Sequence, residues 1–273
     1  MRFHVLTGVP RSGSSLLCNI LRQNPLFCVS PTSELAGMLG VLRTYLSQAP
    51  ETKSELICDP ERTFARICRQ YLALIRTHYY DVGPNRVIVD KSRAWLYNVQ
   101  LLQKILPHAK LVVTVCDLRA SFASVERQHD RTAVLDAHEN PLARTIDGRA
   151  AELLGDTGVI GLPARGVEDL LRRRPSNALV LRMEQFLADP AGGLDMLYQF
   201  FELPRFDHDL ADVKNTNREV DGIWNYKFPH RGEGAVRDQL PDWHSWVPDE
   251  IGAEILRRFP LYHQELGYTD SDG

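Results

Sequence analysis

Short apolar runs alternate with longer amphipathic stretches along most of the chain. Valine, isoleucine and leucine fill the short runs almost without interruption, which is typical of parallel strands buried on both faces of a sheet. The predicted strands are residues 3–7, 86–90, 110–116 and 178–182, with a further short strand just before Glu34. Apolar positions at helical spacing predict helices at about 14–23, 35–48, 60–79, 94–106, 119–131, 140–155, 165–174 and 248–258.

The alternation of strands and helices predicts a P-loop-type, three-layer α/β/α fold around a central parallel sheet of about four to five strands. Asp-Pro pairs at Asp59 and Asp189 support two helix starts, because the carboxylate caps a helix and proline suits its first turn. At about 204–246 the periodicity is lost, and we expect this irregular region to cover the cofactor or acceptor. Residues 1–273 contain no repeat or linker and are interpreted as a single domain.

The composition is that of an ordinary globular protein, with 44% hydrophobic and 25% charged residues among 273. A formal net charge of −3 disfavours a nucleic-acid partner, which usually requires a basic excess. No targeting segment is evident, and no apolar run approaches the roughly 20 residues of a membrane span. Five scattered cysteines without a CxxC pair predict neither disulfides nor a metal site, which favours a reducing, cytoplasmic location.

The clearest chemistry lies in Gly8-Val-Pro-Arg-Ser-Gly-Ser-Ser15, between the first predicted strand and the first helix. Backbone N–H groups at a helix N-terminus form a ready anion site. Gly8, Gly13 and Ser15 match the spacing of the nucleotide-binding loop G-x-x-x-x-G-K-S/T. Ser14 replaces its lysine, however, and Arg11 within the loop supplies the positive charge. The segment therefore predicts an anion site that differs from that of an ATPase.

Two other interpretations of this segment stay open. A kinase or NTPase would lack its main contact to the outer phosphates, although residues 87–90 resemble a strand that ends in a magnesium-binding aspartate, Asp90. Alternatively, the segment is only a tight turn between a strand and a helix. The convergence of glycines, an arginine and three hydroxyl groups favours the anion site.

Three segments together resemble a known enzyme family. Residues 9–15, Val-Pro-Arg-Ser-Gly-Ser-Ser, resemble the 5′-phosphosulfate loop of sulfotransferases that use 3′-phosphoadenosine 5′-phosphosulfate (PAPS). The resemblance is closest to the tyrosylprotein-type and related bacterial or viral branches, which carry arginine where cytosolic enzymes carry lysine. Residues 111–124 resemble the family's second motif, which binds the 3′-phosphate, and residues 181–203 resemble its YEDLLxDP…LxxFLGL stretch.

The resemblance implies the same fold and a PAPS-dependent transfer that needs no metal. Arg11 would contact the sulfuryl and bridging oxygens, while loop amides surround the 5′-phosphate. Sulfuryl transfer depends on in-line placement and on stabilising charge at the leaving oxygen. The implied cofactor-binding residues of the loop are Pro10, Arg11, Ser12, Gly13, Ser14 and Ser15.

The chain departs from the family pattern at two positions. Ser124 of the second motif is present, but Cys116 stands where an arginine normally helps to hold the 3′-phosphate. The neutral thiol removes a charge-assisted contact of roughly 1.5–3 kcal/mol, so an arginine restored there is expected to tighten binding of adenosine 3′,5′-bisphosphate (PAP) unless the C-terminal loop already fills the gap. Arg119 or Arg127 could substitute for the missing arginine, and Met183 replaces the usual tyrosine.

The family's C-terminal loop covers the adenosine and adds basic residues to the 3′-phosphate. By resemblance, Lys227 and Arg231 are cofactor-binding residues that could compensate for Cys116. Trp224 and Tyr226 could stack on adenine or fill a core.

Transfer to a hydroxyl requires a general base. The Lys-Thr-His segment of cytosolic sulfotransferases matches Lys91-Ser-Arg93, and arginine cannot act as a base at neutral pH. By resemblance to the tyrosylprotein-type enzymes, Glu34 is the predicted catalytic base, the alternative being that it caps the helix that starts near Leu35. His230 is a second candidate base.

Lys91 is predicted at the C-terminal end of a central strand, where open α/β sheets place their ligands. It would hold the transferring sulfuryl group and the bridging oxygen, with Asp90 orienting Lys91 or the acceptor. The predicted catalytic set is therefore Arg11, Lys91 and Glu34.

The sequence thus predicts a sulfotransferase that moves the sulfuryl group of PAPS to a hydroxyl or amine of a small molecule, peptide or glycan. The alternatives are a P-loop kinase or NTPase and a catalytically degenerate PAPS- or PAP-binding protein, the latter suggested by Cys116 and Met183. Segments at about 35–58, 132–165 and 204–246 are expected to select the acceptor.

Overall fold

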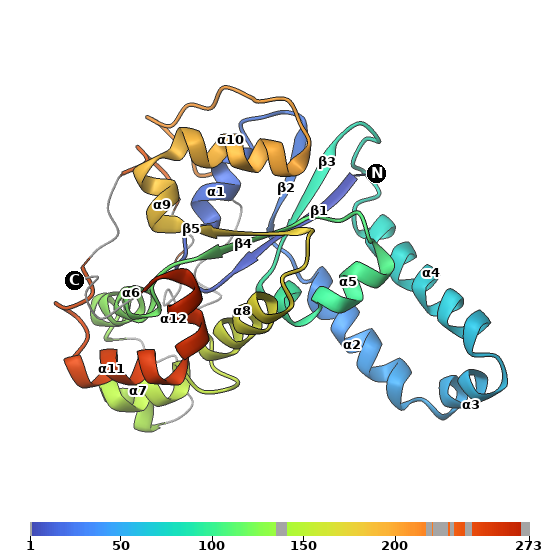
Figure 1. Ribbon diagram of the computed structural model, residues 1–273, viewed down its shortest axis with the longest axis horizontal. Coiled ribbons are helices and arrows are strands. Elements are labelled where there is room, and N and C mark those ends of the chain that lie inside the picture. Colours follow the sequence, from blue (N-terminus) through green and yellow to red (C-terminus); the bar gives the residue numbers. More distant parts are fainter. Residues whose placement is uncertain are drawn as a thin grey trace.

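The computed structural model describes residues 2–134, 141–216, 220, 229, 232–237 and 242–268. Five strands form one parallel sheet in the order β2-β3-β1-β4-β5 (Figure 1). β1 is central and pairs with β3 on one side and β4 on the other. The predicted α/β fold with a parallel sheet of four to five strands is confirmed. The strands are β1 (Arg2–Gly8), β2 (Phe27–Thr32), β3 (Val87–Lys91), β4 (Leu111–Val115) and β5 (Ala178–Arg182).

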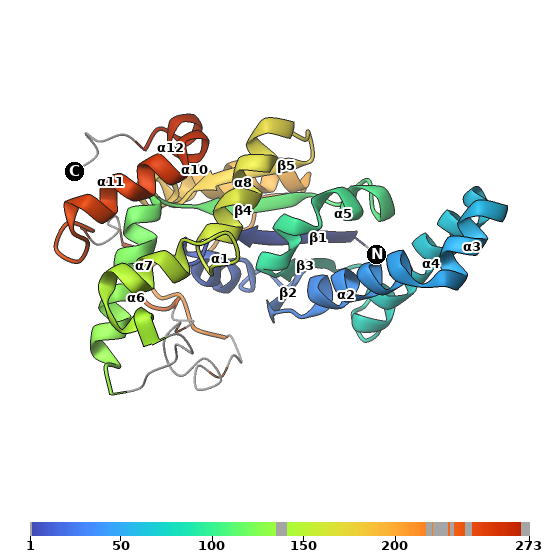
Figure 2. The ribbon, with the colours of Figure 1, turned by 90° about the horizontal axis from the view of Figure 1, so that it is seen from below.

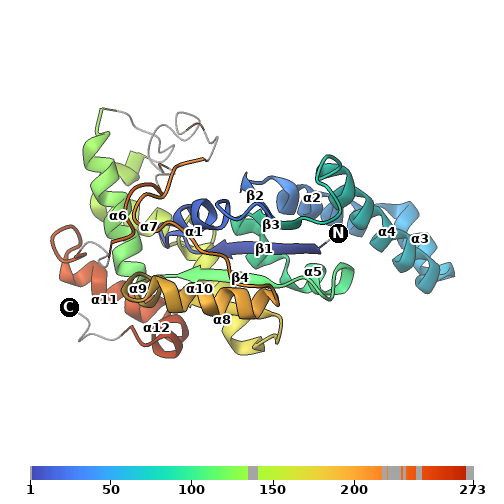
Figure 3. The ribbon, with the colours of Figure 1, turned by 90° about the horizontal axis from the view of Figure 1, so that it is seen from above.

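Helices cover both faces of the sheet and complete the three layers. One face carries α1 (Ser14–Leu21), α9 (Met183–Ala188) and α10 (Pro190–Phe201), as Figures 1 and 3 show. The opposite face carries α5 (Val99–Ile105) and α8 (Gly161–Arg173), which lie in front of the sheet in Figure 2. The elements at the end that bears the site are α6 (Leu118–Arg131), η2 (Pro141–Arg144), α7 (Ile146–Leu153), α11 (Asp249–Arg258) and α12 (Pro260–Leu266).

Three helices form an arm that extends beyond the sheet (Figures 1 and 2). They are α2 (Leu35–Gln48), α3 (Pro50–Cys58) and α4 (Pro60–His78). α3 lies where the apolar pattern indicates no regular element, and only Thr52 of its residues is buried. The pattern missed α3 because a helix with little buried surface carries no apolar stripe.

The helix predicted at 94–106 divides into two elements. A 3₁₀ helix, η1 (Arg93–Tyr97), precedes α5, and Asn98 lies between them. The amide of Asn98 donates to the Trp95 carbonyl oxygen at 3.0 Å, and its side chain donates to the Ala94 carbonyl oxygen at 2.9 Å. Asparagine competes with the helical backbone for hydrogen bonds, which explains the break.

Two helices begin at residues other than those predicted. The pattern at 140–155 becomes η2 followed by α7, because the Thr145 hydroxyl accepts a hydrogen bond from the Gly148 amide and caps a new helix there. α8 begins four residues before its predicted start of 165, with Pro163 in its first turn, where proline is tolerated.

Both predicted Asp-Pro caps are confirmed. The Asp59 carboxylate accepts a hydrogen bond from the Arg62 amide, and the Asp189 carboxylate accepts one from the Gly192 amide. The buried apolar side chains form one cluster that extends from Phe3 on β1 to residues after α12. This cluster holds the C-terminal ends of β1, β3 and β4 rigidly at one edge of the sheet.

Candidate functional site

The loop between β1 and α1 leaves the C-terminal end of the central strand. Gly8 has a φ of 152°, and a Cβ there would lie 2.1 Å from the Thr114 carbonyl oxygen on β4. Gly13, the N-cap of α1, has a φ of 72°, and its Cβ would lie 2.4 Å from Cε of Met183. Both positions therefore favour glycine, because the backbone of β4 approaches the first and the second has a left-handed φ.

Buried hydroxyl groups support the loop from the interior. Ser12 Oγ lies 2.7 Å from the Val9 carbonyl oxygen and 2.7 Å from Thr114 Oγ1. Ser121 on α6 donates to the Pro10 carbonyl oxygen at 2.8 Å. The Ser12 side chain thus stabilises the loop, and the expectation that this residue binds a ligand rests on its backbone amide.

The loop borders a cavity of about 270 Å³. The ends of β2 and β3 form the opposite wall, so segments far apart in the sequence meet there. All loop residues predicted to bind the cofactor line this cavity except Ser12, and Lys91 lines it as well. The polar and charged side chains that line it are Arg11, Ser14, Ser15, Thr32, Lys91, Ser92 and Arg93.

Lys91 ends β3 and is 7% exposed. Its ammonium donates to Ser15 Oγ at 3.2 Å and to Thr32 Oγ1 at 3.1 Å. The Ser30 hydroxyl accepts the Lys91 amide at 2.8 Å, which holds the end of β3 beside β2. A lysine charge is therefore placed at the N-terminal end of α1, where a helix favours an anion.

Asp90 points away from this cavity into the core. Its Oδ1 accepts from Trp95 Nε1 at 2.6 Å, and its Oδ2 accepts from the Tyr79 hydroxyl. Burial raises the pKa of the Asp90 carboxyl. These bonds tie β3 to η1 and α4, so Asp90 neither orients Lys91 nor presents a carboxylate to a magnesium ion.

Glu34 is exposed at the start of α2. Ser33 provides the capping hydroxyl, because its Oγ accepts the Leu35 amide at 3.1 Å. Glu34 does not line the cavity, although Thr32, two residues earlier, does. The Glu34 carboxylate therefore does not cap α2. Glu34 lies at the first end of this helix, which is the end nearest the cavity.

The second predicted motif runs from β4 into α6. Asp117 caps α6 by accepting the Arg119 amide at 2.8 Å, and it forms an ion pair with the Arg119 guanidinium at 2.6 Å. Arg119 is 2% exposed, and its guanidinium lies 4.7 Å from the centre of the Trp243 ring. Arg119 is thus bound to the carboxylate and the indole, which removes it as a substitute for the arginine absent at 116.

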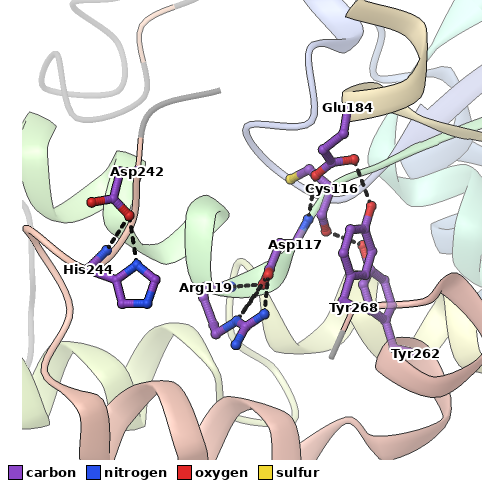
Figure 4. Close-up of polar contacts among 8 residues, drawn as sticks. All are labelled: Cys116, Asp117, Arg119, Glu184, Asp242, His244, Tyr262 and Tyr268. Atoms are coloured by element: carbon purple, nitrogen blue, oxygen red, sulfur yellow. Dashed lines mark hydrogen bonds and ion pairs between the residues drawn. The ribbon is translucent and has the colours of Figure 1, made fainter. Parts of the chain in front are cut away.

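Cys116, between β4 and α6, is 1% exposed, and the C-terminal tyrosines Tyr262 and Tyr268 lie beside its backbone (Figure 4). The Tyr262 hydroxyl donates to the Cys116 carbonyl oxygen at 2.7 Å. Glu184 accepts from the Asp117 amide and from the Tyr268 hydroxyl, both at 2.9 Å. Burial, followed by the nearby carboxylates, raises the pKa of the Cys116 thiol. The thiol is enclosed by protein and does not line the cavity.

The two motifs meet through Arg11. Its Nε donates to Ser124 Oγ at 3.0 Å, across 113 positions of sequence. Its guanidinium also donates to the Pro229 carbonyl oxygen at 2.8 Å. Arg11 and Ser124, which the sequence assigned to one ligand, are therefore neighbours.

A family profile described as the sulfotransferase family matches residues 5–208. The chain belongs to the sulfotransferase family. None of the curated proteins matches it.

Solved structures share the fold. Mouse sulfotransferase SULT7A1 complexed with PAP is 12% identical, with a TM-score of 0.55 over 99% of this chain and 85% of that one. The sulfotransferase from Alicyclobacillus acidocaldarius is 15% identical, with a TM-score of 0.53 over 99% and 97%. The sulfotransferase domain of the Synechococcus PCC 7002 olefin synthase is 17% identical, with a TM-score of 0.53 over 95% and 94%. At these identities the likeness shows the fold alone.

Several predicted residues of this sulfotransferase lie outside the described residues: Trp224, Tyr226, Lys227, His230 and Arg231. Two described residues beside them have clear contacts. Pro229 lines the cavity, and the Gly232 carbonyl oxygen accepts from Asn19 of α1 at 2.8 Å. A Cβ on Gly232 would lie 2.6 Å from the Leu16 amide nitrogen, so Gly232 itself lies against the start of α1.

A second, more open groove of about 830 Å³ follows α2 and η1. Its lining residues come shortly after those of the first cavity in two segments of the chain, since Ala94 follows Arg93 and Ala36 follows Thr32 by four positions. The residues that line it are Ala36, Gly37, Gly40, Val41, Arg43, Thr44, Tyr45, Ser47, Gln48, Ala94, Tyr97 and Asn98.

Within the described ranges no three His, Cys, Asp or Glu side chains are grouped so that they could hold a metal ion. No helix in these described ranges is long and apolar enough to cross a membrane.

Sequence reasoning missed Thr32, Tyr262 and Tyr268 as parts of the site region. Thr32 follows an apolar strand and could have been found as a hydroxyl at a strand end. The two tyrosines carry no such signal, because Tyr262 meets Cys116 across 146 positions of sequence.

Proposed function

We propose that this sulfotransferase moves the sulfuryl group of PAPS to a hydroxyl or amine acceptor by in-line transfer. The observation that carries the proposal is the position of Lys91, whose ammonium lies between Ser15 of the loop and Thr32 of β2 at the start of α1. A buried lysine beside a helix N-terminus suits a ligand with adjacent anionic groups.

The donor groups fit a phosphosulfate. The first turn of α1 offers backbone amides that have no partner within the helix, and Ser14 and Ser15 add hydroxyl groups. No carboxylate is present among the described residues that line the cavity. The bound PAPS would supply an activated sulfuryl group, so the protein's task is placement and charge stabilisation.

Lys91 would stabilise the charge that develops on the phosphate oxygen as its bond to sulfur breaks. Its two hydroxyl partners keep the ammonium in place before the reaction, so little reorganisation is needed. Arg93 lines the same cavity and would add positive charge on the acceptor side.

We propose Glu34 as the base that takes the acceptor's proton, with His230 as the second candidate. Glu34 lies in the chain between Thr32, which lines the cavity, and Ala36, which lines the groove. An acceptor in the groove would bring its hydroxyl to the junction that Glu34 borders. The groove is lined mostly by α2, which belongs to the 35–58 segment expected to select a small molecule, peptide or glycan, and also by Ala94, Tyr97 and Asn98.

Binding and transfer test this function together. Calorimetry with PAP and with ATP–magnesium should give binding of PAP alone. Transfer from radiolabelled PAPS to a panel of phenols, alcohols and amines should fall at least about 100-fold in Lys91→Ala, since such charge stabilisation typically contributes 10²–10³. Lys104→Ala, which removes an exposed lysine on α5 outside the segments expected to select the acceptor, is the matched control and should transfer at the wild-type rate.

Other outcomes would redirect the assignment. Tighter binding of ATP–magnesium than of PAP would favour a kinase or NTPase and end the proposal. Binding of PAP with no transfer to any acceptor would favour a degenerate binding protein. Glu34→Ala should lose transfer and keep PAP affinity, and full activity in that variant would remove Glu34 as the base.

A further inference from the structure

Arg11 occupies an unusual backbone conformation. Its φ is 66°, in the left-handed region that residues other than glycine rarely adopt. Gly8 and Gly13 already provide flexibility on either side of it. An arginine held in this conformation points to a requirement for its side chain in one direction.

The direction is toward α6. Arg11 Nε lies 3.0 Å from Ser124 Oγ, whereas Lys91 donates to Ser15 and Thr32 on the other side of the loop. The Arg11 guanidinium and the Lys91 ammonium therefore lie on opposite sides of the loop. One is at the start of α1 and the other is beside the half-buried Ser124.

The other cationic or reactive groups of the second motif are enclosed. Arg119 is held by Asp117 and Trp243, and Cys116 is only 1% exposed, with its carbonyl oxygen bound by the Tyr262 hydroxyl. Arg11 is thus the basic side chain that the structure places in hydrogen-bond contact with Ser124.

We propose that Arg11, together with Ser124, binds the 3′-phosphate of the donor, while Lys91 and the start of α1 bind its 5′-phosphosulfate. This inference rests on the proposed function, because PAPS carries one anionic group on each side of its ribose. It changes the role expected for Arg11, which the loop resemblance assigned to the sulfuryl end. Arg11, from the first motif, then takes the role in 3′-phosphate binding that the family gives to the arginine at the position of Cys116.

A matched pair of ligands separates the two roles. PAP and adenosine 5′-monophosphate (AMP) share the 5′-phosphate and differ in the 3′-phosphate. Arg11→Gly removes the guanidinium and suits a positive φ, so the variant is expected to fold. Dissociation constants of both ligands are measured by calorimetry, with competition for the weaker one.

We expect Arg11→Gly to weaken PAP about 10- to 100-fold, the range for a lost charge-assisted hydrogen bond, and to change AMP less than about threefold. Ser124→Ala should lose PAP affinity in the same selective way but to a smaller extent. Lys91→Ala should weaken both ligands similarly and preserve their ratio.

Each outcome decides the matter. Equal weakening of PAP and AMP by Arg11→Gly, in a wild type that prefers PAP, would overturn the inference and leave the proposed function intact. A wild type that binds no PAP would end both. If Arg11→Gly unfolds, Arg11→Lys repeats the comparison, since it keeps the charge and loses the guanidinium's Nε donor.

Discussion

Two strand-turn-helix units meet at the C-terminal edge of the sheet, and each carries an arginine near the start of its helix. In the unit β1-loop-α1, Arg11 is half-buried and extends toward Ser124. In the unit β4-turn-α6, Arg119 is 2% exposed and pairs with Asp117. An arginine near the start of the helix therefore lines a cavity in the first unit, where it is Arg11. In the second unit the corresponding Arg119 is buried in a structural ion pair.

The difference comes from the residues that link each strand to its helix. In the first unit, residues 8–15 contain no carboxylate that could cap the helix and hold the arginine within the same turn. The second unit has Asp117 there, which caps α6 and pairs with Arg119. An arginine beside a helix start indicates an anion site only where no adjacent carboxylate binds it first.

The largest effect should come from breaking the buried pair. Asp117→Ala leaves the Arg119 charge buried without its partner, which typically costs about 3–5 kcal/mol of the free energy of unfolding. Urea denaturation measures the loss. The double variant Asp117→Ala with Arg119→Met should recover part of it, and a loss under about 1 kcal/mol in the single variant would contradict the assignment.

Restoring the family's arginine at position 116 should harm the fold rather than improve binding. Cys116→Arg forces a long charged side chain into an enclosed site and should cost about 3 kcal/mol through overpacking and buried charge. Thermal unfolding in the presence and absence of PAP tests this. Cys116→Ala is the control, with about 1 kcal/mol lost and an unchanged PAP affinity, and a stable Cys116→Arg with tighter PAP binding would reverse the conclusion.

A smaller effect is expected one helical turn beyond Ser124. Arg127 lies on the same face of α6, and burial together with Arg131 lowers the pKa of its guanidinium. Arg127→Ala should weaken PAP by about fivefold, near 1 kcal/mol, and leave AMP unchanged, because a second positive charge is lost beside Ser124. Calorimetry measures both, with the exposed Arg131→Ala as control; unaltered PAP affinity in Arg127→Ala would limit the site to Arg11 and Ser124.

The smallest effect should be a difference between two variants of Arg11. Arg11→Gly and Arg11→Ala both lose the side-chain hydrogen bonds to Ser124 and Pro229. The left-handed conformation costs a residue with a Cβ roughly 1–2 kcal/mol, whereas glycine avoids this strain but loses about 0.5–1 kcal/mol because its unfolded chain is more flexible. Arg11→Gly should therefore be about 0.5 kcal/mol more stable than Arg11→Ala in urea denaturation, and equal stability of the two variants would place the strain elsewhere.

The sheet and one wall of the cavity were predictable because their signals are local. Apolar runs mark β1, β3, β4 and β5, and the loop spacing marks Gly8, Gly13 and Ser15. Lys91 was found because it directly follows a buried run. In each case the residues that determine the structure are adjacent in the chain.

The remaining features depend on contacts between distant segments. Nothing near Arg119 shows that Trp243 will cover it, and nothing near Cys116 shows that Tyr262 will bind its carbonyl. The direction of Arg11 depends on a φ value and on Pro229, neither of which has a pattern in the sequence. Sequence reasoning identified Ser124 and Arg11 and could not show that they touch.

The hydrogen bond between Tyr262 and Cys116 also has a consequence for synthesis on the ribosome. The two residues are 146 positions apart, so at roughly 5–20 residues per second the tyrosine emerges about 7 to 30 seconds after the cysteine. During that interval the Cys116 carbonyl oxygen at the end of β4 lacks the hydrogen bond from the Tyr262 hydroxyl. The second strand-turn-helix unit is therefore completed well after the loop that it faces has been made.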